Sequence, residues 1–158
     1  MLQLVETWLR RAFTALAVVA AAAGVSIVLL VGSSVAMRHI ARAPFRFTEE
    51  LVGLLMTSAF FLALPLVTLN AENVRVRIVV DSLAPRSRRW VSLIAGLFGV
   101  SFALWFFWLC IPWFEFAYLR SIKTEVGRLL MYPWMAVIPG AMLLTAVAFA
   151  VRVFKADS

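Results

Sequence analysis

Four long apolar stretches dominate the chain, and every Asp, Glu, Lys and Arg lies outside them. The stretches cover residues 12–37, 51–71, 90–114 and 129–151. A helix needs about 20 residues to cross a hydrocarbon core about 30 Å thick, and each stretch is long enough. Strands of a membrane barrel would instead alternate apolar and polar residues over about 10 positions. The pattern therefore predicts an all-α integral membrane protein with four transmembrane helices.

The composition agrees with this interpretation. Apolar residues make up 64% of the 158-residue chain and charged residues 15%, whereas soluble domains are roughly 45–50% apolar and about 25% charged. The segments between the apolar stretches are too short to bury a hydrophobic core of their own. We therefore expect residues 1–158 to form a single four-helix transmembrane domain.

Shorter amphipathic patterns predict helices that lie on the membrane surface before the first span, after the second and after the third. The positions that recur at helical spacing are Leu2, Val5, Leu9 and Phe13; Val76, Val79, Val80 and Leu83; and Phe116, Leu119, Ile122 or Lys123, and Val126. Alternation of valine and isoleucine over residues 74–80 is also compatible with a strand. A lone strand at a membrane surface leaves backbone groups unsatisfied, which favours the helix.

A cleaved signal peptide is the alternative interpretation of the first span. Arg10 and Arg11 precede this span, and residues 34–36 are compatible with a cleavage site. Its apolar run, however, exceeds the roughly 7–15 residues of the apolar region within a signal peptide. We therefore expect residues 12–37 to be retained as a membrane helix.

The distribution of Lys and Arg predicts the orientation, because short cytoplasmic loops carry an excess of these residues. The side with both termini has the larger share: Arg10, Arg11, Arg75, Arg77, Arg86, Arg88, Arg89, Arg152 and Lys155. The other side has Arg38, Arg42, Arg46, Arg120, Lys123 and Arg128. We therefore expect both termini in the cytoplasm, with the first seven of these arginines beside lipid headgroups. Lipid contact accounts for the net charge of +7, and we expect no nucleic-acid partner.

The spans contain hydroxyl-bearing residues but no charged ones. Proton relays and ion-coupled carriers keep charged groups at membrane depth, so we do not expect this chain to transport a solute alone. With one cysteine, Cys110, and one histidine, His39, the chain has neither an intrachain disulfide nor a histidine-rich metal site. We predict no catalytic residue, no metal site and no cofactor, and hence no enzyme.

Small residues spaced four apart mark several helix faces that allow close packing. They are Ala95, Gly99 and Ala103; Ala136 and Gly140; and Ala20 with Gly24, or Ala22 with Ser26. These faces either pack the four helices together or form a seam for a partner protein. Near the predicted helix ends, Trp8, Trp90, Trp113 and Trp134 are expected to anchor the chain in the membrane interface.

Two adjacent carboxylates, Glu49 and Glu50, stand at the mouth of the second span. Thr48 before them is a predicted N-cap, and the helix dipole favours both carboxylates in the first turn. An alternative role is pairing with cations of another subunit. No nucleophile or second histidine accompanies them, so an acid–base pair is not expected.

The order of these features resembles the small membrane subunit, of the DctQ type, in tripartite ATP-independent periplasmic (TRAP) transporters. The resemblance covers the whole chain and rests on short motifs: the lead-in at residues 42–45, Phe47-Thr48-Glu49-Glu50-Leu51, Val74-Arg75-Val76, Asp81-x-Leu83-x-Pro85-Arg86, Tyr132-Pro133-Trp134, and Pro139. Family members often show His-Ile-Arg-Val-Asp after the second span. This chain departs from that motif with Asn73 and Arg77 at the histidine and aspartate positions.

The resemblance implies a bacterial inner-membrane protein that pairs with a large membrane subunit, while a periplasmic binding protein delivers an organic acid. It also implies that the substrate and sodium sites lie in the large subunit and that the small subunit acts as a scaffold. Two other interpretations are a small homo-oligomeric carrier or channel and a membrane anchor of an unrelated complex.

Overall fold

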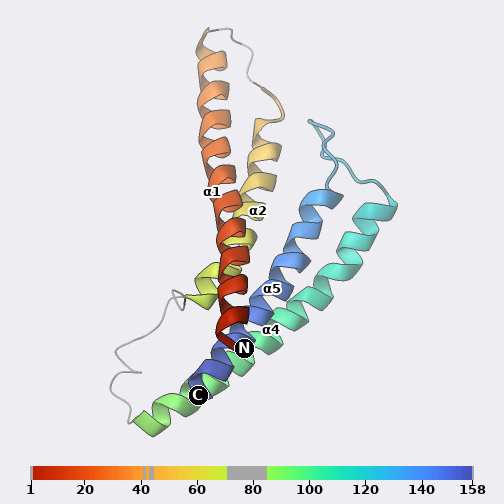
Figure 1. Ribbon diagram of the computed structural model, residues 1–158. Helices are drawn as coiled ribbons and strands as arrows, with labels where there is room; N and C mark the ends of the chain where they lie inside the picture. The colour runs from red at the N-terminus through yellow and green to blue at the C-terminus, as the bar shows by residue number, and fades with distance from the viewer. Residues whose placement is uncertain (1, 41, 43–44, 71–84, 158) are drawn as a thin grey trace.

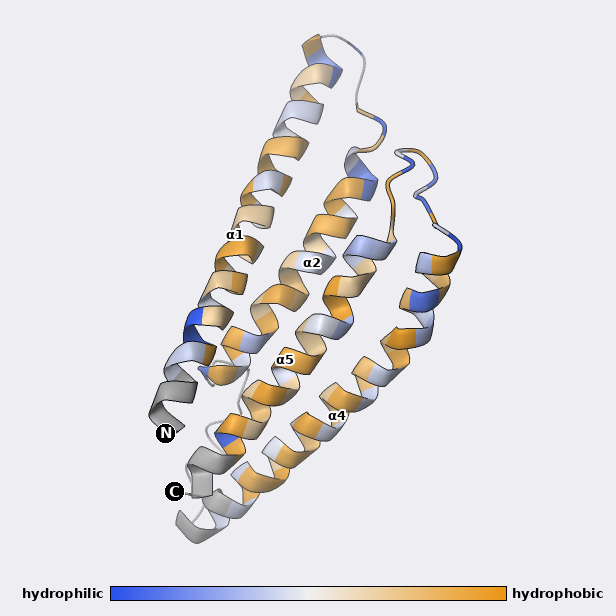
Figure 2. Ribbon diagram, turned by 45° about the vertical axis from the view of Figure 1, so that its right-hand side comes forward, coloured by the Kyte–Doolittle hydropathy of each residue, from blue (hydrophilic) through white to orange (hydrophobic). Residues whose placement is uncertain are grey.

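Four helices dominate the structure, a computed structural model that describes residues 2–40, 42, 45–70 and 85–157 (Figure 1). They are α1 (Leu2–Ile40), α2 (Thr48–Leu69), α4 (Pro85–Leu119) and α5 (Tyr132–Asp157). Each contains a segment long and apolar enough to cross a membrane. Hydrophobic residues run along most of each helix, as Figure 2 shows. The predicted all-α fold with four transmembrane helices is therefore confirmed.

The helices stand side by side in the order α1, α2, α5, α4 (Figure 2). The main contacts join α1 to α2, α2 to α5 and α5 to α4. From the end where both chain termini lie, α1 and α4 run outward, and α2 and α5 return to it (Figure 1). The two central helices, α2 and α5, are therefore parallel. We call the end with the termini the terminal end, and the opposite end, with residues 45–47 and 120–131, the loop end.

The outer helices each bury one narrow face, whereas the central helix α5 is more enclosed. On α1 the buried residues are Phe13, Ala20 and Ser34, and on α4 they are Ala103 and Ala117. On α5 they are Ala141, Met142, Thr145, Ala146 and Ala148. Apart from Phe13 and Met142, these buried side chains are small and let helix backbones approach closely, which is how helices associate in lipid.

Two glycines on α4 provide the closest approach to α5. A Cβ atom added at Gly99 would lie 2.8 Å from the ring of Phe149, and one added at Gly96 would collide with Val153. By contrast, nothing lies within 4 Å of a Cβ added at Gly140. Gly96 and Gly99 are therefore required by packing within this chain.

Aromatic rings also connect α2 with α4, although α5 stands between them in the order of helices. The rings of Phe61 and Phe106 are stacked with centroids 6.2 Å apart. Large aromatic residues on the outer side of α4 are exposed, and two of them, Phe98 and Trp108, are more than 70% exposed. In a membrane this outer side faces lipid or another protein.

The amphipathic segments differ from the prediction. Residues 2–11 are helical but continue directly into α1, so they do not form a separate surface helix. α1 has 39 residues, about 58 Å, and therefore extends beyond the hydrocarbon core. The helix predicted over residues 116–126 is wrong: α4 ends at Leu119, and a turn with a Lys123–Leu130 bridge follows. The predicted helix over residues 76–83 lies outside the described residues.

Replacing Gly99 by valine should destabilise the α4–α5 contact, because the new side chain overlaps the ring of Phe149. Overpacking of this kind costs about 1–3 kcal/mol. Thermal unfolding of the purified chain in one detergent measures the effect. Gly140→Val is the matched control, since it adds the same side chain in open space. Equal melting temperatures for the two variants would contradict the assigned packing.

Candidate functional site

The first turn of α2 carries both predicted carboxylates, Glu49 and Glu50. Glu49 is exposed and Glu50 is half-buried. Thr48, however, is not the N-cap: that position is Phe47, which makes no side-chain capping bond. The Thr48 hydroxyl instead donates a hydrogen bond of 3.0 Å to the carbonyl oxygen of Phe45. The predicted cap was wrong because this hydroxyl serves the preceding turn.

Glu50 binds the loop that joins α4 to α5. Its Oε1 accepts a hydrogen bond of 2.8 Å from the backbone N–H of Val126, and its Oε2 accepts one of 2.7 Å from Gly127. Hydrogen bonds to an ionised carboxylate are shorter and stronger than neutral ones. We call this arrangement the carboxylate clamp, because one side chain of α2 holds two adjacent amides of a distant loop.

The clamped segment, residues 121–131, is a small hairpin loop. Thr124 and Leu129 pair through a backbone bond of 2.9 Å, and the Leu129 amide donates to the Thr124 hydroxyl at 3.0 Å. The Met131 amide donates to the Ile122 carbonyl at 2.9 Å. These bonds give the loop its own framework, so the clamp fixes the whole hairpin against α2.

Gly127 permits the close approach of the hairpin to the start of α2. A Cβ atom at this position would lie 2.9 Å from the Cβ of Phe47 and 3.1 Å from Oε2 of Glu50. Any larger residue would push the backbone away from the carboxylate. The glycine is therefore part of the clamp, a role that sequence pattern does not reveal.

A second polar contact ties α2 to α5 at the terminal end. Nη1 of Arg152 on α5 donates to the carbonyl oxygen of Thr68 on α2 at 3.2 Å. The last carbonyls of a helix lack partners within the helix, and the helix dipole favours a cation there. The last turn of α2 has no basic residue of its own. Arg152 therefore supplies the missing cation from the neighbouring helix.

The sequence indicated Arg152 only as a positive charge of the C-terminal segment and did not predict this contact. The available signal was indirect: Arg152 directly follows an apolar span, while the end of α2 lacks a basic residue. Thr68 itself is 1% exposed, and its hydroxyl has no hydrogen-bond partner in the structure. The Thr68 carbonyl, in contrast, accepts from Arg152 and also from the backbone N–H of Asn70, the C-cap of α2.

The contacts made by Glu50 and Arg152 both hold helices together. They lie at opposite ends of α2, which has 22 residues and hence a length of about 33 Å. Within the described residues, no three His, Cys, Asp or Glu side chains come together as a metal site. A carboxylate bound to amides and a guanidinium bound to a carbonyl hold helices in register.

The predicted small-residue faces divide between the inside and the outside of the helix layer. Gly99 and Ala103 face inward, against α5 in the case of Gly99. Ala95, Ala136 and Gly140 are exposed. Contact of these exposed positions with a partner stays a prediction.

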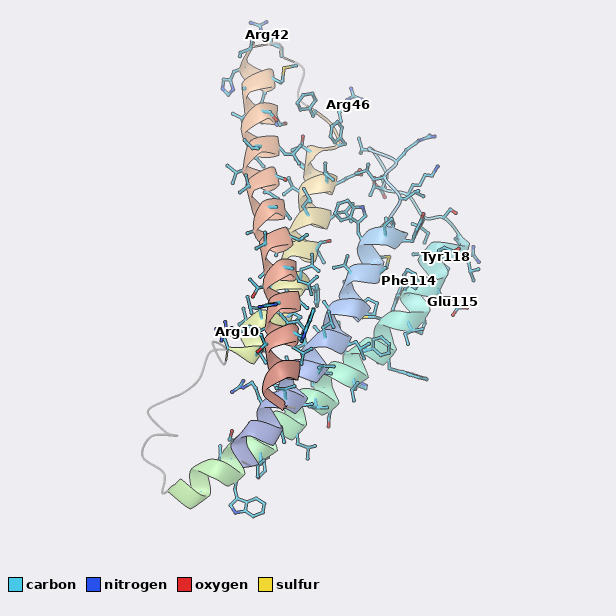
Figure 3. The ribbon with its side chains drawn as sticks, in the orientation of Figure 1. Arg10, Arg42, Arg46, Phe114, Glu115 and Tyr118 are labelled. Atoms are coloured by element: carbon cyan, nitrogen blue, oxygen red, sulfur yellow. The ribbon has the colours of Figure 1, made fainter. Side chains whose placement is uncertain are left out.

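The predicted interfacial and headgroup residues lie towards the helix ends. Trp8, Trp90 and Trp113 are exposed, and Trp134 is half-buried. Arg10 lies towards the terminal end, whereas Arg42 and Arg46 lie at the loop end (Figure 3). Arg11 is exposed beside Arg10, and Arg86, Arg88 and Arg89 lie in the first two turns of α4. Arg75 and Arg77 fall outside the described residues.

Four apolar helices and charges confined to their ends define a multi-pass membrane protein. Over residues 27–157 the sequence matches the family described as "Tripartite ATP-independent periplasmic transporters, DctQ component". The chain therefore belongs to this family, the small membrane component of TRAP transporters. No curated protein matches the sequence.

Replacing Glu50 by alanine should release the hairpin loop, because the amides of Val126 and Gly127 lose their acceptors. We expect hydrogen exchange of residues 121–131 to become roughly tenfold faster or more, as for a locally opened segment. Mass spectrometry of a peptide covering the loop measures this rate. Glu49→Ala, an exposed carboxylate of the same turn, is the control. An unchanged rate in Glu50→Ala would rule out the clamp.

Replacing Arg152 by methionine should loosen the terminal end, since the methionine keeps the apolar stem and removes the donor to Thr68. We expect the free energy of unfolding to fall by about 1 kcal/mol, a value typical of one hydrogen bond. The measurement is the melting temperature in a fixed detergent. Arg11→Met, at an exposed position on α1, should leave it unchanged. Identical melting temperatures for both variants would show that the contact is not stabilising.

Proposed function

We propose that this chain is the non-catalytic scaffold of a TRAP-type secondary transporter. In this proposal it holds a large membrane subunit in place while that subunit takes up an organic acid. A periplasmic binding protein delivers the acid, and the substrate and sodium sites lie in the large subunit. This chain carries no cofactor and lies in the bacterial inner membrane.

The observation that carries the proposal is the double attachment of α2. Glu50 joins its first turn to the loop between α4 and α5, and Arg152 of α5 joins its last carbonyls. Packing at Gly99 and Gly96 then connects α5 to α4. Because its helices are joined to one another at both ends, the layer resists sliding of one helix past the next. A partner subunit that moves during transport needs such a rigid counterpart.

The placement of charge supports a passive role. The charged side chains of the described spans lie at their ends, as Glu49, Glu50 and Arg152 illustrate. Coupled carriers require charged groups at membrane depth. We therefore assign ion coupling to the partner. The excess of Lys and Arg on the side of the termini supports a cytoplasmic terminal end, and the loop end then faces the periplasm.

Reconstitution in vesicles tests the scaffold. The large subunit is reconstituted with and without this chain, and uptake of labelled organic acids is measured in the presence of the binding protein and a sodium gradient. We expect uptake to fall at least about tenfold without this chain, because a transport domain without a fixed counterpart loses productive motion. Equal uptake by the large subunit alone would contradict the proposal.

A double variant separates scaffolding from substrate choice. Glu49→Ala with Glu50→Ala should weaken the complex or the start of α2 without changing the order in which organic acids are preferred. Uptake from a panel of mono- and dicarboxylates measures that order. A changed preference would place substrate recognition in this chain.

A further inference from the structure

The outer side of α4, the helix at one edge of the layer, carries an exposed stripe through the middle of its span (Figure 2). Its positions recur at alternating intervals of four and three residues, the pattern of a helix face that packs along another helix. The exposed residues at these positions are Ile94, Phe98, Ser101, Trp105 and Trp108. We call these five residues the outer stripe.

Two tryptophans of the outer stripe lie far from the membrane surfaces. The middle of the apolar run 90–114 is residue 102, and Trp105 and Trp108 are about 4.5 and 9 Å from it along the helix. Tryptophan normally lies at the interface, where its N–H finds water or headgroups. Trp90 and Trp113, at the two ends of the run, occupy such positions. The indole N–H groups of Trp105 and Trp108 lie within the hydrocarbon core instead.

The polar groups of the outer stripe are unpaired. Among the described residues, the structure gives no hydrogen-bond partner to the Ser101 hydroxyl or to the indole N–H of Trp105 and Trp108. Ser26 and Thr57, by contrast, donate to carbonyl oxygens of their own helices at 2.9 Å. Because an unpaired polar group in hydrocarbon is costly, the stripe favours a neighbour that supplies hydrogen bonds.

The outer stripe itself contains a complementary donor and acceptor. The Trp105 indole is a donor only, whereas the Ser101 hydroxyl oxygen also accepts. A long side chain on a helix leans towards the turn before its own Cα, so the Trp105 indole leans towards the level of Ser101. Copies of one membrane chain insert in the same direction, and a two-fold axis along the membrane normal places identical residues at the same depth. Two facing stripes therefore satisfy each other.

We propose that the outer stripe is a dimer interface between two copies of this chain. The Trp105 N–H of each copy donates a hydrogen bond to the Ser101 hydroxyl of the other, at the middle of the membrane. Phe98 and Trp108 flank this pair and supply aromatic contact area. The interface goes beyond the scaffold role, because it concerns contacts of this chain with itself.

Photo-cross-linking in native membranes tests which molecule covers the outer stripe. A benzoylphenylalanine side chain replaces Phe98, and in the control it replaces Val25, which is 61% exposed near the middle of the apolar run of α1. After illumination we expect a product of twice the mass of this chain from the Phe98 variant and none from the Val25 variant. Mass spectrometry of the joined peptides identifies the product. Adducts of the Phe98 variant with lipid alone, or with a different polypeptide alone, would overturn the proposal.

Removing the donor while keeping an aromatic ring tests the hydrogen bond. The full chain with Trp105→Phe is reconstituted in liposomes, and its dimer fraction is measured by single-molecule photobleaching over a range of protein densities. We expect the association constant to fall about tenfold, because symmetry removes two hydrogen bonds between helices at once. Trp113→Phe removes an exposed indole N–H at the end of the run and should dimerise as wild type does. Equal dimerisation of the two variants would count against the bond.

A double-mutant cycle assigns the acceptor. Ser101→Ala alone should weaken dimerisation about as much as Trp105→Phe, and the two changes together should weaken it little further, since each removes the same bond. Fully additive effects would show that the two residues do not bind each other. A chain that stays monomeric in membranes yet still supports uptake by a large subunit would overturn the dimer interface and leave the scaffold role intact.

Discussion

The ionised carboxylate of Glu50 and the two amides that it binds connect parts of the chain that are far apart in sequence. Helices in lipid gain nothing from the hydrophobic effect when they associate, so close packing and polar bonds decide how they are arranged. The bonds to Val126 and Gly127 join the start of α2 to the loop between α4 and α5. Through them the first and second halves of the protein meet at the loop end.

The rest of the layer extends this constraint. Arg152 repeats the connection at the terminal end by donating to the last turns of α2. Between these polar ends the contacts are steric, because Gly99 accepts the ring of Phe149 and small residues line the buried face of α5. Polar bonds at the ends and close packing in the middle suit a membrane, where an unpaired polar group in hydrocarbon is costly.

Apolar and charged residues occupy different parts of the helix layer. The spans carry apolar contacts for lipid or a membrane partner, and the loop end carries charges held in a fixed geometry. Glu50 lies at the boundary between them. The charged residues of the spans lie at their ends, and this is why the proposed function assigns the coupling chemistry to a partner subunit.

The sequence by itself determined the class of the protein, because span length and apolarity are local properties that any 20-residue window reveals. The four helices, the carboxylates in the first turn of α2 and the family follow from such windows and short motifs. Periodicity failed at residues 120–126, where apolar spacing indicated a helix but bonds to Glu50 hold a hairpin.

Only the tertiary structure decided the partners of Glu50 and Arg152 and the inward or outward direction of each small-residue face. Glu50 and Val126 are 76 positions apart, and Thr68 and Arg152 are 84 apart. Glu50 binds backbone amides, and Arg152 binds a backbone carbonyl. Because almost every residue carries these groups, the identity of a side chain does not mark the partner. Such contacts depend on which helices become neighbours, and that is settled by packing across the whole layer.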